Sequence, residues 1–195
     1  ADLNKHSVRP TRSIGILYDH RDPLSALART LIDKVSVFRN LTEIEKTNIS
    51  NRSTKLFTLS SIFQGTVCLL RKTQKPKEVS KKEESLAISY WENVSNNIKD
   101  WQLAAEKSVS THELRRDYIH SHALAMHAIG RLGACLLSTA NKDYKKELEK
   151  LKKVDWARKN KALWEGRAMI AGKISKSHNS VILTTNHLKN TLGLK

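Results

Sequence analysis

The 195-residue sequence predicts an all-α fold, a mostly helical multi-helix domain in which residues 13–18 are the one candidate for a short strand. Three observations favour this fold class. Apolar residues recur every three or four positions through most of the chain, which is the spacing of one helix face. Ser, Thr and Asp stand repeatedly at positions that cap helix starts. The alternation of strands and helices that marks a parallel α/β sheet does not occur.

The first helix is predicted to begin at residues 22–23, Asp-Pro, because a carboxylate caps free backbone N–H groups and proline fits the first helical position. Apolar residues then continue at helical spacing to Val35. Residues 42–45 have the capping-box pattern, which predicts a second short helix. Ser53 or Thr54 is expected to cap a third helix, which the segment 75–77, Lys-Pro-Lys, would end.

Residues 80–83 and 110–113 also have the capping-box pattern. The first predicts a helix to about residue 101, and the second opens the longest apolar helix, over residues 114–137. Gly130 and Gly133 inside that run cost about 1 kcal/mol each in helix propensity against Ala. We expect glycines at such places to permit close helix packing.

The remaining segments are predicted to be helical as well. Residues 144–154 indicate a charged amphipathic helix, Asp155 caps a segment over residues 156–170, and residues 185–192 form a last helix that ends at Gly193. Two helices around a glycine-containing turn are similar to a helix-turn-helix, but the roughly 3–4-residue turn of that motif is not met.

The formal net charge is +16 and lies at the two ends of the chain. Residues 1–40 and 41–79 carry net charges of +3 and +4, residues 80–140 are neutral, and residues 141–195 carry +9. A neutral middle is typical of a structural core or a dimer surface. Basic flanks favour a polyanionic partner, with DNA or RNA first. The alternative is that the lysine-rich faces are merely solvated.

Composition indicates a soluble globular protein, with 39% hydrophobic residues and a mean hydropathy of −0.50. No apolar run approaches the roughly 18 residues of a membrane span, and no signal-peptide pattern occurs. Cys68 and Cys135 lie in apolar stretches without a CxxC pair or zinc spacing. We therefore expect two buried free thiols in a reducing cytoplasm.

Catalytic motifs are absent from the sequence: it contains no phosphate-binding glycine loop, dinucleotide fingerprint, HExxH or GxSxG. We expect no enzymatic activity, no cofactor and no metal. His120, His122 and His127 are the densest candidate cluster, and packed histidines are favoured over a metal site because no i, i+4 pair occurs.

Three further groups allow two interpretations each. Residues 19–22, Asp-His-Arg-Asp, allow acid–base chemistry, although a helix cap and a phosphate contact are the simpler roles. Residues 115–117, Arg-Arg-Asp, allow phosphate binding, although a structural ion pair is favoured. Trp164 allows base stacking, although core packing is favoured.

Three basic segments are the candidates for contact with nucleic acid. They are the amino-terminal residues around Pro10, residues 51–55 at a predicted helix start, where N–H groups and hydroxyls suit a phosphate, and residues 158–179. The predicted DNA-binding residues are Lys5, Arg9, Arg12, Arg21, Arg52, Lys55, Arg158, Lys159, Lys161, Arg167, Lys173, Lys176 and His178.

Four stretches of the sequence resemble one family. Residues 1–24 open with ADLN and close with YDHRDPL, residues 50–64 read SNRSTKLFTLSSIFQ, residues 113–133 read ELRRDYIHSHALAMHAIGRLG, and residues 154–194 begin VDWARKNKALWEGRAM. Together they resemble DndB-like DNA sulfur-modification proteins of the DGQHR-domain family. The Asp-Gly-Gln-His-Arg motif that names the family does not occur in this sequence.

The resemblance implies a DNA-binding transcriptional regulator that represses the genes of a DNA phosphorothioation cluster. It implies double-stranded promoter DNA as the partner, with other sulfur-modification proteins and a second copy of the chain as further partners. The alternative is a protein-interaction scaffold of the same machinery, which would dock through the apolar, neutral residues 80–140. Because the chain starts without Met and lacks the motif, we expect residues 1–21 to be the seam from an absent DGQHR domain and residues 22–195 to form one helical domain.

Overall fold

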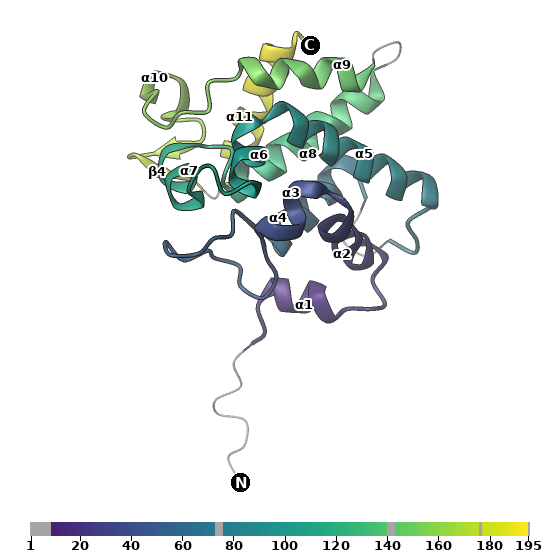
Figure 1. The fold of residues 1–195 in the computed structure, drawn as a ribbon. Coiled ribbons are helices and arrows are strands. Elements are labelled where there is room, and N and C mark those ends of the chain that lie inside the picture. The colour runs from purple at the N-terminus through teal and green to yellow at the C-terminus, as the bar shows by residue number, and fades with distance from the viewer. Residues whose placement is uncertain (1–8, 73–75, 140–142, 176, 195) are drawn as a thin grey trace.

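A computed structural model describes residues 9–72, 76–139, 143–175 and 177–194 and confirms a predominantly helical fold (Figure 1). The helices are α1 (Arg12–Tyr18), α2 (Pro23–Lys34), α3 (Ser36–Leu41), α4 (Leu59–Leu70), α5 (Lys81–Asn97), α6 (Lys99–Ala105), α7 (Thr111–Asp117), α8 (Ala123–Ser138), α9 (Tyr144–Leu148), the 3₁₀ helix η1 (Glu149–Lys153), α10 (Lys161–Trp164) and α11 (His178–Leu192). Two short strand pairs accompany them: β1 (Thr42–Glu43) lies parallel to β2 (Phe57–Thr58), and β3 (Met169–Ile170) lies antiparallel to β4 (Lys173–Ile174).

The central feature is the close approach of α4 and α8, on which α1, α2 and α11 also pack (Figure 1). Three glycines allow this close approach because they have no Cβ. A Cβ added to Gly130 would lie 2.0 Å from the carbonyl oxygen of Gly65, and a Cβ added to Gly65 would lie 2.8 Å from that of Met126. A Cβ on Gly133 would meet the side chains of Leu69 and Tyr90 at 2.5 Å. The expectation that the α8 glycines permit close packing is therefore confirmed.

Aromatic side chains fill the core around this helix pair. Trp91 and Trp101 are fully buried, and their indole N–H groups donate to Thr66 Oγ1 (3.0 Å) and His120 Nδ1 (3.1 Å). Neither indole N–H is therefore buried without a hydrogen-bond partner. Trp164 is also fully buried and stacks on Trp156 with ring centroids 6.0 Å apart. Core packing of Trp164 is therefore confirmed.

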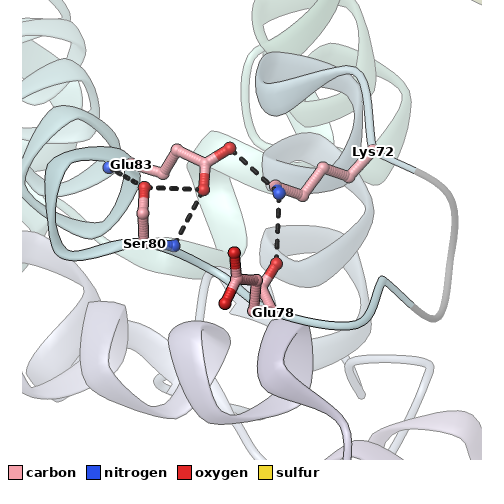
Figure 2. A network of polar contacts seen from close by, with 4 residues as sticks. All are labelled: Lys72, Glu78, Ser80 and Glu83. Atoms are coloured by element: carbon pink, nitrogen blue, oxygen red, sulfur yellow. Dashed lines mark hydrogen bonds and ion pairs between the residues drawn. The ribbon is translucent and has the colours of Figure 1, made fainter.

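Local capping signals predicted two helix starts correctly. The Asp22 side chain accepts hydrogen bonds from the backbone of Leu24 and Ser25, with Pro23 as the first residue of α2. Ser80 and Glu83 form a reciprocal capping box at the start of α5. Figure 2 shows that Lys72, just after α4, completes this network by pairing with Glu83 at 3.0 Å. Gly193 ends α11 with φ of 71°, as predicted.

The predicted strand over residues 13–18 is wrong, because the segment forms helix α1. The Thr11 side chain accepts from the Ile14 amide and caps the helix, and the inward residues Ser13 and Ile16 follow helical spacing. A short apolar run does not distinguish strand from helix by periodicity. The helix predicted from residue 42 is also wrong, because α3 already ends there and the Thr42 hydroxyl donates to the Phe38 carbonyl at 2.7 Å.

The third predicted helix begins later than expected. Thr58, rather than Ser53 or Thr54, caps α4 by accepting from the Ser61 amide. Residues 51–55 therefore lie in the loop between β1 and β2, where the Ser53 hydroxyl accepts from the Lys55 amide, and not at a helix start.

The long helix predicted over residues 114–137 is broken into α7 and α8. The backbone between them pairs with a distant segment, since Ile119 N donates to Trp156 O (2.9 Å) and Arg158 N donates to Asp117 O (2.8 Å). Ser110 precedes α7 without a side-chain cap bond, so this predicted capping box does not form. Hydrogen bonds to a segment about 40 residues later in the chain therefore end the helix where the local apolar pattern predicts that it continues.

The helix predicted over residues 156–170 is also wrong. Asp155 accepts from the Ala157 amide in a turn, and only the short α10 follows. A β3–β4 hairpin then turns at Ala171 and Gly172, both with positive φ, which is the geometry of a type I′ turn. Because this hairpin separates α10 from α11, the two do not form a helix-turn-helix.

Candidate nucleic-acid interface

A cleft of about 1020 Å³ opens where α1, the loop between β1 and β2, the starts of α4 and α8, α7 and the β3–β4 hairpin meet. In Figure 1 that loop, α7 and β4 lie on the same side of the molecule. Its basic lining residues are Arg12, Arg115, Arg116, Arg158, His112, His122 and His127. No aspartate or glutamate lines it within the described parts of the chain.

Arg115 holds the outer wall of this cleft. Its guanidinium donates to the carbonyl oxygens of Ser50 (3.1 Å), Asn51 (3.3 Å) and Ser53 (3.1 Å), and also to that of Lys55. These acceptors are neutral carbonyl groups, so the arginine orders the loop and keeps its formal charge. Burial lowers the pKa of Arg115, although an arginine remains charged at any physiological pH.

Arg158 has the same kind of partners and lies beside the end of α7. It donates to the carbonyl oxygens of Arg116 (2.8 Å) and Gly172 (2.9 Å), which ties the β3–β4 hairpin to the end of α7. Its guanidinium donates to carbonyl oxygens and, among the residues that the structure describes, to no carboxylate, although its charge helps to lower the pKa of the Asp117 carboxyl. Arg115 and Arg158 therefore both line the cleft and both hold its backbone segments in place.

Arg12 and Arg116 stand at the rim and differ in charge balance. Arg12 is exposed, donates to Gln64 Oε1 at 2.8 Å and lies over the Phe63 ring. Arg116 pairs with Asp117 at 2.7 Å, and this contact lowers the pKa of the Asp117 carboxyl. The structural ion pair predicted for residues 115–117 is confirmed for Arg116 and Asp117.

His122 and His127 line the cleft as neutral imidazoles. Burial lowers the pKa of His122 to about 4, with Arg158 adding to the effect, and burial with Arg12 nearby lowers that of His127 to about 4. His122 is the N-cap residue of α8, but its side chain makes no capping hydrogen bond. Backbone amides of the first turn of α8 therefore lie at the cleft without a side-chain acceptor from the cap. The α8 start adds a partial positive charge to the cleft.

His120 is accounted for by packing. It is fully buried, its Nδ1 accepts from the Trp101 indole at 3.1 Å, and its Nε2 therefore carries the proton toward Asp100 Oδ2 at 2.9 Å. Ser121 Oγ also lies 3.1 Å from Nδ1, which has the outline of a serine–histidine–aspartate relay. The indole N–H already occupies the single lone pair of Nδ1, so this histidine is fixed as a core group. Among the described residues, no group of three or more His, Cys, Asp or Glu could hold a metal.

The structure brings two of the predicted DNA-binding residues into the cleft, Arg12 and Arg158. Arg9, Arg21, Arg52, Lys159, Lys161, Lys173 and His178 are exposed outside it, Lys55 donates to the Asn40 carbonyl, and Arg167 donates to that of Leu163. Lys5 and Lys176 lie outside the described residues. The predicted set is therefore spread over the molecule, and only its cleft members converge.

The predicted DNA-binding set omits Arg115, His112, His122 and His127, although phosphate binding is one interpretation of residues 115–117. No local signal reveals that Arg115 holds the loop, because its carbonyl partners lie 60 to 65 positions earlier in the chain. The predicted DNA-binding residues lie in the basic segments toward the ends of the chain, whereas Arg115 lies in the neutral segment 80–140.

The two cysteines line a smaller cavity of about 480 Å³ between α4, α8 and α11. Both are free, and both are partly exposed rather than buried as predicted. Partial burial still raises the pKa of the Cys68 thiol. Arg71, at the edge of this cavity, donates to the Ala134 carbonyl, and Lys72 is paired with Glu83.

Within the described residues, no helix combines the length and apolarity that crossing a bilayer requires. A family model described as DndB, DNA-sulfur modification-associated, matches residues 1–195. No curated protein and no solved structure matches the chain.

Proposed function

The chain belongs to the DndB family of DNA-sulfur modification-associated proteins, and from this premise we propose that it is a DNA-binding repressor of a phosphorothioation gene cluster. In this proposal it acts in the cytoplasm, without catalysis, on double-stranded promoter DNA. The observation that carries the proposal is the cleft with several cations and no lining carboxylate.

The charge of the cleft supports a polyanionic partner. Arg115 and Arg158 donate to neutral backbone carbonyls and keep their formal charges, which would attract an anion. Exposed cations continue the positive surface beside the cleft, with Lys159 next to Arg158 and Lys173 on β4. Such a surface would contribute the phosphate contacts that position a DNA-binding protein on its site.

The scaffold alternative finds less support. Its docking surface was expected in residues 80–140, but the large apolar side chains of that segment are buried or partly buried, and none of those that the structure describes is exposed. Among the described residues, the exposed large hydrophobic side chains are Tyr18, Ile44 and Ile170, all outside it. Other sulfur-modification proteins and a second copy of the chain remain proposed partners, which would need to bind elsewhere.

Binding of a promoter duplex as a function of salt tests the proposal. Log affinity should fall linearly with log salt, with a slope of about −0.9 for each phosphate neutralised. Arg12→Gln should make this slope shallower by about one such unit. Arg12 suits the test because it is exposed and donates its hydrogen bond to the partly exposed side chain of Gln64, so its loss should not disturb the fold.

The matched control is Lys82→Gln, which removes one exposed charge on α5 and leaves the cleft unchanged. It should leave the slope as it is. An affinity that does not change with salt, or the absence of duplex binding at low salt, would contradict the proposal.

A further inference from the structure

We propose that the interior of the cleft binds an unpaired nucleotide unit, with its phosphate on the arginines and its base against the apolar wall. The proposal deepens the proposed function and rests on it where the nucleotide belongs to DNA. The rim would contact the duplex backbone, while the interior would take a nucleotide from a single strand, from an extruded base or free in solution.

The shape of the cleft excludes a duplex from its interior. Its volume of about 1020 Å³ is at the upper end of the roughly 300–1,000 Å³ range of small-ligand pockets. Phe57, Leu124 and Val181 line it although each is at most 7% exposed, so the cleft reaches down to the core. A rod-shaped duplex can touch the exposed Arg12 at the rim, but a single nucleotide is thin enough to enter.

The lining offers a partner for each part of a nucleotide: positive charge for the phosphate and apolar surface for the base. Arg115 and Arg158 would attract a phosphate through their fixed charges, which the neutral carbonyl groups that they hold do not cancel. Ile49, in the loop between β1 and β2, and Ile174, in strand β4, are partly exposed apolar residues that line the same cleft. Bases bind to proteins by lying against such apolar or planar groups.

Polar side chains at the same site could read the edge of a base. Asn48 and Asn51 line the cleft from the loop, and each amide offers two donors and an acceptor. Asparagine is a usual partner of base edges for this reason. A plain inorganic-anion site would use neither these amides nor the apolar wall.

Contacts within the protein hold the walls of the cleft. Four backbone carbonyls hold Arg115, and three hold Arg158, so the loop and the hairpin are tied to α7. Because the walls are already ordered, a ligand would lose little free energy to arranging them.

The test compares three probes by equilibrium binding at one salt concentration. The probes are a single-stranded DNA tetranucleotide with a 5′ phosphate, deoxyadenosine monophosphate, and a blunt duplex with hairpin-closed ends. We expect the tetranucleotide or the mononucleotide to bind, and the closed duplex not to displace either. Binding of the tetranucleotide alone would assign the site to a single strand, and binding of both would assign it to the nucleotide unit itself.

Ser60→Trp and Asn51→Trp block the interior and retain every arginine, since both residues line the cleft. Asn51 is exposed in the loop, so its variant should fold even where Ser60→Trp does not. Each folded variant should weaken unpaired-nucleotide binding by about tenfold or more, the equivalent of one lost base contact. Asn190→Trp, exposed on α11 outside the cleft, is the control and should bind as the parent protein does.

The outcomes separate this proposal from the proposed function. Salt-dependent duplex binding, with unpaired probes that fail to bind or bind equally well after the cleft is blocked, would overturn the nucleotide proposal alone. Equal competition by the closed duplex would also overturn it. Absence of binding to every probe and to the promoter would overturn both.

Discussion

Replacing Gly130 with alanine should destabilise the protein strongly, although alanine is the better helix former. The new methyl group would lie 2.0 Å from the Gly65 carbonyl oxygen and 2.8 Å from its carbonyl carbon. An ordinary carbon–oxygen contact is about 3.3 Å. The helices α4 and α8 would therefore have to separate by roughly 1 Å along this contact.

The expected net loss is about 2 kcal/mol or more. Alanine gains about 1 kcal/mol over glycine in helix propensity. Overpacking of a well-filled core costs about 1–3 kcal/mol and sometimes more. The upper end applies here because the obstacle is the backbone of a packed helix, whereas a flexible side chain could move aside.

Urea unfolding followed by circular dichroism measures the difference. With a slope of about 1–3 kcal/mol per molar urea, the midpoint should fall by about 1 M. Gly15→Ala is the matched control, because Gly15 lies within helix α1 and a Cβ there meets nothing within 4 Å. A Gly130→Ala midpoint equal to or above that of Gly15→Ala would show that α4 and α8 accommodate the added methyl group without loss of stability.

Three further predictions concern pH, the loop and the helix caps. The pKa of His127 is about 4 in the folded protein against an ordinary 6.5, so the unfolded chain binds more protons between these values and stability should fall as pH drops from 6.5 to 4. The loss is up to about 3 kcal/mol for this residue, and His127→Gln should flatten the pH dependence of the urea midpoint; an unchanged dependence would contradict the assignment. Arg115→Gln should release the loop over residues 44–56 and speed its limited proteolysis, whereas the neighbouring Arg116→Gln, which loses only an exposed ion pair, should not; equal cleavage rates would argue against the tether. Ser80→Ala should cost about 1 kcal/mol in thermal or urea unfolding, and Ser110→Ala, at a helix start without a side-chain cap bond, should cost much less; equal losses would mean that the Ser80 cap bond contributes nothing.

The predictions that succeeded depended on residues close together in the chain. The Asp22 cap is a contact across two or three residues, as is the Ser80–Glu83 box. A cap lies within one turn of the residues that it stabilises, so the sequence contains the whole interaction. The failures arose where a local pattern competed with a distant partner, as at Ile119, whose amide bonds to Trp156 and ends the predicted long helix.

The site was only partly predictable for the same reason. Arg12 and Arg158 could be named because they stand in basic segments, and the structure places both in the cleft. Arg115 has the most backbone contacts of the cleft arginines, but it stands beside Arg116 in a string that resembled an ion-paired helix end. Its role follows from carbonyl groups in a loop that no spacing rule connects to it.

The helical class, the caps at Asp22 and Ser80, the glycines of α8 and the excess of positive charge can be recognised in the amino-acid sequence, because each depends on residue type or on neighbours within about one helical turn. Three-dimensional packing was needed to bring Gly130 against Gly65, to hold the loop through Arg115, and to place cations from the two basic ends and the neutral middle in one cleft. These outcomes depend on which surfaces pack together, and packing joins residues 60 or more positions apart, which periodicity does not record.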